Sequence, residues 1–175
     1  MERAKKMRYR DHHRREDLGG EHAAGDLGQL ILLMIFLAVW ISDTFFTHKS
    51  IWLTDRLPAA IRLPLGLFIL LLSGALAGAG LWIIFGKVRE SPRVVREGVF
   101  QWVRHPIYLA AMLYYLGLLV FSLSLFAAMV WVVIVAFYFY LSRHEEKLLI
   151  EKFGAEYQQY MREVPMFLPR LKKRT

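Results

Sequence analysis

Two short clusters of polar residues in this chain of 175 residues carry side chains that could bind a small charged ligand. The first is Arg104-His105-Pro106-Ile107-Tyr108, and the second is Arg143-His144-Glu145-Glu146. Proline fits the first turn of a helix, where its missing N–H costs nothing. His105 would then lie beside the exposed amides of a helix start, which favour anions. A cation-rich helix start that faces two carboxylates would suit a zwitterionic ligand.

Four apolar segments would have to position these clusters, and each is long enough to span or nearly span a bilayer, which takes about 20 helical residues. They cover residues 27–46, 64–85, 106–121 and 124–141. The last two are so close in the sequence that they must form a tight antiparallel hairpin. The hairpin brings the two polar clusters to one membrane surface. We therefore predict an all-α integral membrane protein with about four transmembrane helices and a C-terminal amphipathic segment in the cytosol.

The composition agrees with this fold class, because 56% of the residues are hydrophobic and only 22% are charged. These values exclude a disordered, collagen-like or coiled-coil chain. The chain has no cysteine, which excludes disulfides, thiolate metal sites and a cysteine nucleophile. His12, His13 and His22 have no partners at a usable spacing, so we predict no metal site.

The net charge of +8 is distributed unevenly along the chain. Residues 1–26, 86–105 and 142–175 hold 20 Lys and Arg residues together, whereas residues 47–63 hold three. Because positive residues stay on the cytosolic side, both termini and the 86–105 connection are predicted to be cytosolic. The membrane would be the plasma or inner membrane of a prokaryote, or the endoplasmic reticulum of a eukaryote. The basic N-terminal run suits anionic headgroups rather than nucleic acid.

The tail after the fourth span has the pattern of an amphipathic helix from about Arg143 to Met161. Its apolar residues recur at helical spacing, and charged residues fill the positions between them. Gly154 should divide the tail into two pieces, which would close over the cytosolic end of the bundle. The chain then divides into a polar segment (1–26), two spans (27–85) and a functional core (86–175).

Several residues have a purely structural interpretation. Gly74 and Gly78 form a small-residue face on the second span, for which we favour internal packing, with a homodimer seam as the alternative. Asp43 would contact a substrate or a neighbouring helix, or reach the membrane interface. Arg104 is interpreted as a headgroup anchor and Glu146 as part of a solvated face. Tyr157 and Tyr160 are interpreted as packing and interface residues.

Both clusters belong to longer motifs. Residues 98–108, Gly-Val-Phe-Gln-Trp-Val-Arg-His-Pro-Ile-Tyr, resemble the glycine–aromatic–Arg-His-Pro-x-Tyr signature of the isoprenylcysteine carboxyl methyltransferase family. The tail is similar to that family in Glu145, Glu146, Leu149, Phe153, Gly154, Tyr157, Tyr160, Val164, Pro165 and Pro169. Phospholipid methyltransferases share related elements. The resemblance runs from about Pro92 to Pro169, whereas the first two spans match only as generic helices.

The resemblance implies methyl transfer from S-adenosylmethionine, which enters from the cytosol, to a lipid or prenylated acceptor that approaches from the bilayer. An aromatic ring at Phe100 or Tyr108 could stack on adenine or face the sulfonium. Glu145 could pair with the amino group of the cofactor, and the helix start with its carboxylate. Carried over by position, the cofactor contacts fall on Pro92, Arg93, Val94, Val95, Phe100, His105, Pro106, Ile107, Tyr108 and Glu145.

The substrate position departs from the family. Its prenylcysteine enzymes carry an arginine four residues before the cofactor-binding glutamate, and this arginine binds the substrate carboxylate. Here that position is Leu141, and Arg143 lies about 200° further around a helix. Leu141 and Arg143 are thus the candidate substrate residues, and Glu145 and Arg143 the candidates for catalysis, with Glu145 assisting deprotonation of an amine acceptor.

Alternative functions remain at this point. A phospholipid amine or a small lipophilic molecule is the alternative acceptor. A four-helix transporter or scaffold is the alternative class, but a transporter should carry ionisable groups near the bilayer midplane. The spans here are nearly free of charge apart from Asp43, which disfavours transport.

Overall fold

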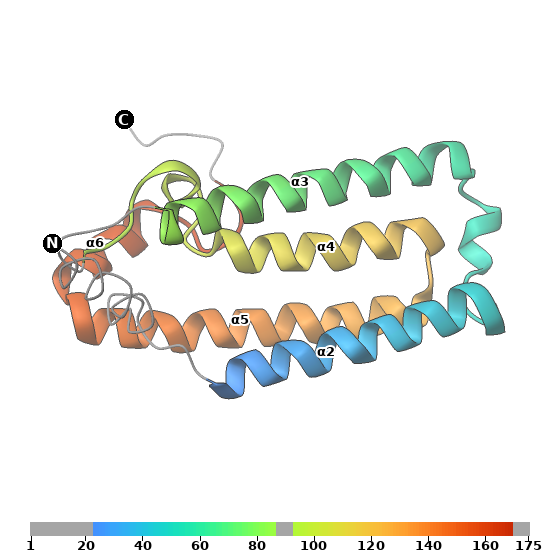
Figure 1. The fold of residues 1–175 in the computed structure, drawn as a ribbon, viewed down its shortest axis with the longest axis horizontal. Helices are drawn as coiled ribbons and strands as arrows, with labels where there is room; N and C mark the ends of the chain where they lie inside the picture. Colours follow the sequence, from blue (N-terminus) through green and yellow to red (C-terminus); the bar gives the residue numbers. More distant parts are fainter. Residues whose placement is uncertain (1–22, 87–92, 170–175) are drawn as a thin grey trace, which may run out of the picture.

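The computed structural model describes residues 23–86 and 93–169, and every regular element in these two ranges is helical. The long helices are α2 (Ala23–Ile41), which continues into the π-helical turn Ser42–Thr47, α3 (Ala59–Phe85), α4 (Pro106–Ser122) and α5 (Leu125–Phe153). The shorter helices are α6 (Ala155–Glu163) and two 3-10 turns, Trp52–Asp55 and Gly98–Gln101. Figure 1 shows the long helices side by side in one elongated bundle.

Three of the helical segments are long and apolar enough to cross a bilayer: Gly25–Thr47, Ala59–Phe85 and Leu125–Phe153. α4 is a shorter apolar helix of 17 residues, about 25 Å long at 1.5 Å per residue. Large apolar side chains such as Met34, Phe68 and Leu71 are exposed on the outside of the bundle, as expected where lipid replaces water. The chain is therefore an all-α, multi-pass membrane protein, as the apolar segments predict.

The helices pack in two pairs, with α3 along α4 and α2 along α5 (Figure 1). A tight turn at Ser122–Ser124 joins α4 to α5 and confirms the predicted hairpin. In this turn Leu123 has a φ of 50°, and the Ser124 hydroxyl accepts a hydrogen bond from the Ala127 amide at 3.2 Å, which caps α5.

Close packing of α3 against α4 depends on Gly66, Gly80 and Gly117. Gly80 belongs to the predicted small-residue face, and a Cβ there would lie 2.9 Å from the Ile107 side chain. A Cβ at Gly66 would lie 2.5 Å from the Phe121 ring, and one at Gly117 would lie 2.7 Å from the Leu70 side chain. Gly74 and Gly78 would have nothing within 4 Å of a Cβ. The interpretation of these two residues as internal packing is therefore wrong, and a homodimer through them stays a prediction.

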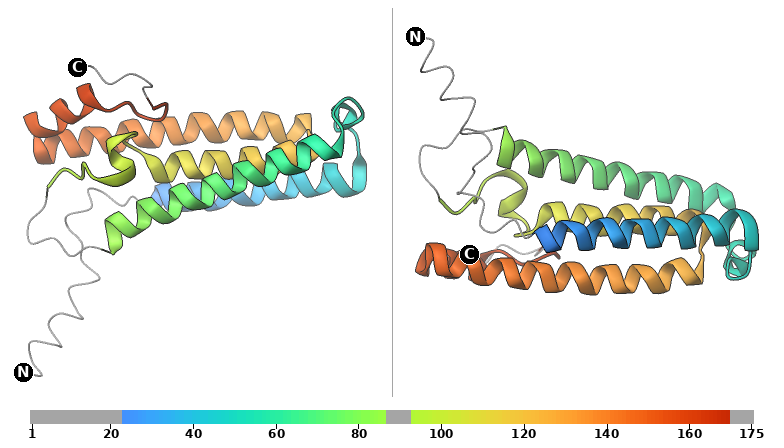
Figure 2. Two further views of the ribbon diagram at one scale, coloured as in Figure 1. Left: turned by 90° about the horizontal axis from the view of Figure 1, so that it is seen from above. Right: turned by 60° about the horizontal axis from the view of Figure 1, so that its bottom comes forward.

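α5 extends well beyond the apolar segment, so the fourth span and the first part of the tail are one continuous helix. It ends at Phe153, and Gly154 follows with a φ of 57°, a conformation that favours glycine. The predicted break at Gly154 is confirmed. α6 then turns back beside the end of α5, at the end of the bundle where α3 also ends (Figures 1 and 2).

A buried polar network closes the opposite end of the bundle. The Asp43 side chain is almost fully buried and accepts hydrogen bonds from the Ser124 hydroxyl (2.6 Å), the Ser50 amide (3.1 Å) and the Thr47 hydroxyl (3.2 Å). The Ser50 hydroxyl also donates to Asp43, and the Leu125 amide donates to the Ser50 carbonyl at 3.3 Å. Asp43 thus contacts neighbouring elements, as one of its predicted roles required, and ties the end of the first span to the hairpin turn.

Candidate functional site

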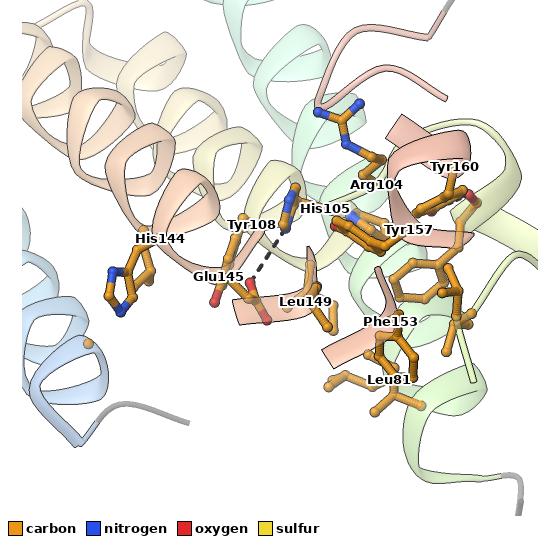
Figure 3. A pocket seen from close by; sticks show the side chains of 18 of the residues that line it. Leu81, Arg104, His105, Tyr108, His144, Glu145, Leu149, Phe153, Tyr157 and Tyr160 are labelled. Carbon is orange, nitrogen blue, oxygen red and sulfur yellow. Dashed lines mark hydrogen bonds and ion pairs between the residues drawn. The ribbon is translucent and has the colours of Figure 1, made fainter. Parts of the chain in front are cut away.

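A cavity of about 410 Å³ lies at the end of the bundle where the two polar clusters meet. This volume is within the range of roughly 300–1,000 Å³ that is typical of small-molecule sites. Its walls come from the starts of α2 and α4, the end of α3, residues 93–105, the polar part of α5, and α6 (Figure 3).

His105 is the residue that connects the two clusters. It is the N-cap of α4, with a φ of −121°, and Pro106 occupies the first turn as predicted. The buried ring lies between two carboxylates of α5: Nδ1 is 3.5 Å from Glu145 Oε2, and Nε2 is 3.2 Å from Glu146 Oε1. Figure 3 shows the interaction with Glu145 at the cavity.

The two carboxylates determine the charge of His105. Burial of the ring lowers its pKa, but hydrogen bonds to Glu145 and Glu146 outweigh this effect and raise the pKa above its ordinary value. The site therefore favours the imidazolium, which can donate a hydrogen bond from each ring nitrogen.

Arg104 and Glu146 form a buried ion pair. Arg104 Nη2 is 2.7 Å and Nε is 2.8 Å from Glu146 Oε1, and the two side chains are only 8% and 2% exposed. The interpretations of Arg104 as a headgroup anchor and of Glu146 as part of a solvated face are therefore wrong. Removal of either residue would leave the other charge buried without an opposite charge, which is strongly destabilising.

Residues 164–167, which we name the C-terminal strap, run past the start of α4. The Arg104 amide donates to the Pro165 carbonyl at 2.9 Å, and the His105 amide donates to the Met166 carbonyl at 3.3 Å. The Phe167 ring lies 6.0 Å from the His105 ring, centroid to centroid. The strap therefore holds both the backbone and the ring of His105.

Tyr157 and Tyr160 pack as predicted, and they also line the cavity. They form a buried cluster with Val94 and Val164, and the Tyr160 hydroxyl donates to the Phe100 carbonyl at 2.7 Å. Burial raises the pKa of both phenols, so they remain neutral and do not act as bases at neutral pH.

The structure brings most of the predicted cofactor residues to one cavity. Its lining includes Arg93, Val94, Val95, Phe100, His105, Pro106, Ile107, Tyr108 and Glu145. Pro92 lies outside the described residues. Leu141 also lines the cavity, whereas the Arg143 side chain is 58% exposed and its guanidinium lies 5.4 Å from the centroid of the Phe139 ring. Arg143 is therefore not part of the cavity wall.

The cavity also contains residues that the motifs did not identify. Asp26 and Gln29 come from the start of α2, which begins at Ala23 and thus includes the end of the predicted polar segment. Leu81, Ile84 and Phe85 come from the end of α3. Leu149 and Phe153, which belong to the tail motif and follow its helical spacing, also line the cavity, although the motif assigned them no role there.

The cavity offers complementary groups for a ligand with separate charges. Glu145 is a carboxylate with 30% of its side chain exposed. The amides of Ile107 and Tyr108 lie in the first turn of α4, before the first intrahelical bond, which joins the Leu109 amide to the His105 carbonyl at 3.0 Å. In the described ranges 23–86 and 93–169, no group of three or more acidic or histidine side chains could hold a metal ion.

Comparisons with known proteins agree with these motifs. Residues 64–156 match the phospholipid methyltransferase family, so the match includes most of α3, the first motif, the hairpin and the tail motif as far as Gly154. The protein-S-isoprenylcysteine O-methyltransferase of Saccharomyces cerevisiae is 35% identical over 83 residues, which cover 46% of this chain and 35% of that protein. Since the family match extends over more than half of the chain, the chain belongs to the phospholipid methyltransferase family.

Proposed function

We propose that this protein transfers a methyl group from S-adenosylmethionine to an acceptor carried by a membrane lipid. The observation that carries the proposal is the convergence of two motifs, about 40 residues apart, on one cavity at the polar end of a membrane bundle. Family membership supports methyl transfer, and the surrounding apolar helices support an acceptor that arrives through the bilayer.

The cavity residues fit the chemical groups of this cofactor. Glu145 would accept hydrogen bonds from its amino group, and the first-turn amides of α4 would bind its carboxylate. Phe100 or Tyr108 would face the adenine or the sulfonium. Each of these residues lines the cavity, which supports the assignment.

The protein's contribution to the reaction would be binding, orientation and exclusion of water. S-adenosylmethionine would supply a methyl group on a positively charged sulfur, and this sulfur is the leaving group when a nucleophile attacks the methyl group in line. Apolar side chains such as Leu81, Leu149 and Phe153 line the cavity and would keep water from the reacting atoms. Positioning of the two reactants then provides most of the rate acceleration. An acceptor that loses a proton on methylation would deliver it to Glu145.

The cavity wall favours an acceptor with a neutral nucleophile. Leu141 is apolar, Arg143 lies outside the wall, and Arg104 is already paired with Glu146. A carboxylate beside Leu141 would lack the guanidinium expected from the resemblance and would be desolvated at a cost of several kcal/mol. Arg93 also lines the cavity, but it comes from the connection before α4 and not from α5. An isoprenylcysteine carboxylate is the second candidate, on the strength of the yeast relative's name.

Radiolabelled cofactor tests this function directly. Purified protein in lipid nanodiscs should bind methyl-labelled S-adenosylmethionine and transfer the label to a component of a total lipid extract that partitions into organic solvent. The labelled product should be an amine or alcohol derivative and should release no labelled methanol in mild base, whereas a methyl ester would release it. Absence of cofactor binding would contradict the proposed function, and a base-labile product would replace the neutral acceptor with a carboxylate.

A further inference from the structure

We propose that Arg104 and Glu146 are positioning residues that lock the C-terminal strap over His105 and thereby set the geometry of the cofactor site. The inference rests on the proposed function and deepens it, because the buried Arg104–Glu146 pair contacts His105 and the strap at the edge of the proposed cofactor site.

The Arg104 guanidinium joins three parts of the chain. Its Nε and Nη2 contact Glu146 of α5, and its Nη1 donates to the carbonyls of Met161 (3.0 Å) and Val164 (2.5 Å). In Figure 3 the guanidinium points away from Glu145, toward the end of α6 and the strap. The planar fork of an arginine binds a carboxylate through two nitrogens and two carbonyls through the third, whereas a lysine has only three donors on one nitrogen.

We name the contacts of Arg104 with Glu146, Met161 and Val164 the clamp. The oxygen of Glu146 that binds Arg104 also connects the clamp to the cavity. Glu146 Oε1 also lies 3.2 Å from His105 Nε2, and His105 Nδ1 lies 3.5 Å from Glu145. Charges of alternating sign therefore run from Arg104 through Glu146 and His105 to Glu145, the carboxylate at the cavity. Removal of the Glu146 charge would leave two buried cations side by side, so we expect His105 to turn and Glu145 to lose its partner.

A second arginine–glutamate pair, between residues 93–105 and α6, differs from the Arg104–Glu146 pair in its exposure to solvent. Arg96 Nη1 lies 3.2 Å from Glu163 Oε2 and also joins the connection to α6, but the two side chains are 32% and 51% exposed. Exposed pairs contribute little to stability. Glu163 pairs with Arg96 and lies outside the chain of charges that includes His105, so Glu163→Gln is a matched control for Glu146→Gln.

The clamp predicts coupling between the cofactor and the strap. If a seated strap favours cofactor binding, bound cofactor must favour a seated strap to the same degree. The chain has no native cysteine, so a single Met166→Cys substitution reports on the strap through its rate of maleimide labelling. A Leu168→Cys substitution, at a side chain that is 81% exposed, gives the rate for a freely accessible site.

The experiment combines Glu146→Gln, Arg104→Lys or Glu163→Gln with the Met166→Cys reporter. We expect Glu146→Gln to weaken S-adenosylmethionine binding and to speed strap labelling, each by roughly tenfold, within the usual range of coupling between sites. Bound cofactor should slow labelling in the parent protein and in Glu163→Gln. Bound cofactor also slows labelling through global unfolding, so strap labelling must be faster than the unfolding rate of the same variant to show release of the strap.

The outcomes separate this inference from the proposed function. A Glu146→Gln protein that binds S-adenosylmethionine with wild-type affinity would overturn the clamp and leave the proposed function intact. Failure of the parent protein to bind S-adenosylmethionine would overturn both. If Glu146→Gln does not fold, Arg104→Lys decides the question, because it keeps the charge and loses the fork: weaker binding with faster labelling supports the clamp, and wild-type values overturn it.

Discussion

The two ends of the bundle each bury a carboxylate, but they do so in different ways. Asp43 is surrounded by neutral donors, the hydroxyls of Ser50, Ser124 and Thr47 and one backbone amide, and both of its oxygens accept hydrogen bonds. Glu146 is held by the buried Arg104 and His105, with the exposed Arg143 at 4.0 Å from its second oxygen, and the neighbouring Glu145 faces a cavity. The closed network fixes two helix ends, whereas the open one leaves a carboxylate available for a ligand.

The largest contrast that we expect between the two ends is their exposure to opposite sides of the membrane. Lys49 and Gln158 are both exposed, the first beside the Asp43 network and the second on α6. In spheroplasts or sealed vesicles of known orientation, an impermeant maleimide added from the side opposite the cytosol should label Lys49→Cys and not Gln158→Cys. Labelling of both at equal rates would contradict the predicted topology, which rests on the distribution of Lys and Arg.

A change at the closed end should affect stability and spare the site. Asp43→Ala leaves the Ser50 and Ser124 donors buried without an acceptor, so we expect a loss of about 2–5 kcal/mol in the free energy of unfolding. Asp55→Ala, at an exposed acid near the same end, should change it by less than about 0.5 kcal/mol. Thermal unfolding in detergent measures both. A destabilisation no larger than that of Asp55→Ala would show that the Asp43 network is dispensable.

A change at the open end should alter the choice of acceptor. Leu141→Arg places a guanidinium in the cavity wall and should raise turnover of a farnesylated cysteine analogue at least about tenfold, because it removes part of a desolvation cost of several kcal/mol. Leu148→Arg, on the same helix and outside the cavity lining, is the control. Methyl transfer by the wild type that is robust and survives both Arg143→Ala and Arg93→Ala would contradict the preference for a neutral nucleophile.

The smallest effect that we expect is a change in the pH dependence of stability. The raised pKa of His105 contributes stability that is fully present below the ordinary histidine pKa of about 6.5 and is lost as the pH rises through the raised value. His105→Gln should therefore flatten this part of the curve of unfolding free energy against pH. The same measurement on His48→Asn, at an exposed histidine, is the comparison. A wild-type slope in His105→Gln would mean that folding does not raise the pKa of His105.

The helices and the hairpin could be predicted because the length of an apolar run and the shortness of a connection are local properties of the sequence. The convergence of His105 and Glu145 follows from that hairpin. The Arg104–Glu146 pair could not be predicted in the same way, since each charge alone resembles a solvated side chain and their pairing joins residues 42 positions apart.

The contribution of α2 to the cavity could not be predicted from the sequence either. Asp26 and Gln29 line it only because α2 lies along α5 in one particular register. The prediction that Gly74 and Gly78 pack inside the bundle was wrong. A small-residue pattern indicates where a helix can approach, but it does not identify which neighbouring helix does so. Local patterns thus identified the elements, while contacts between distant elements decided the roles of single residues.

The most direct test of the central claim, that the open end holds the cofactor through Glu145, is calorimetry with S-adenosylmethionine on three proteins. These are the wild type, Glu145→Gln, and Glu151→Gln, which removes an exposed carboxylate from the same helix. We predict that Glu145→Gln loses about 1.5–3 kcal/mol of binding free energy, the value of a hydrogen bond to a charged group, while Glu151→Gln binds as the wild type does. Wild-type affinity in Glu145→Gln would contradict the account.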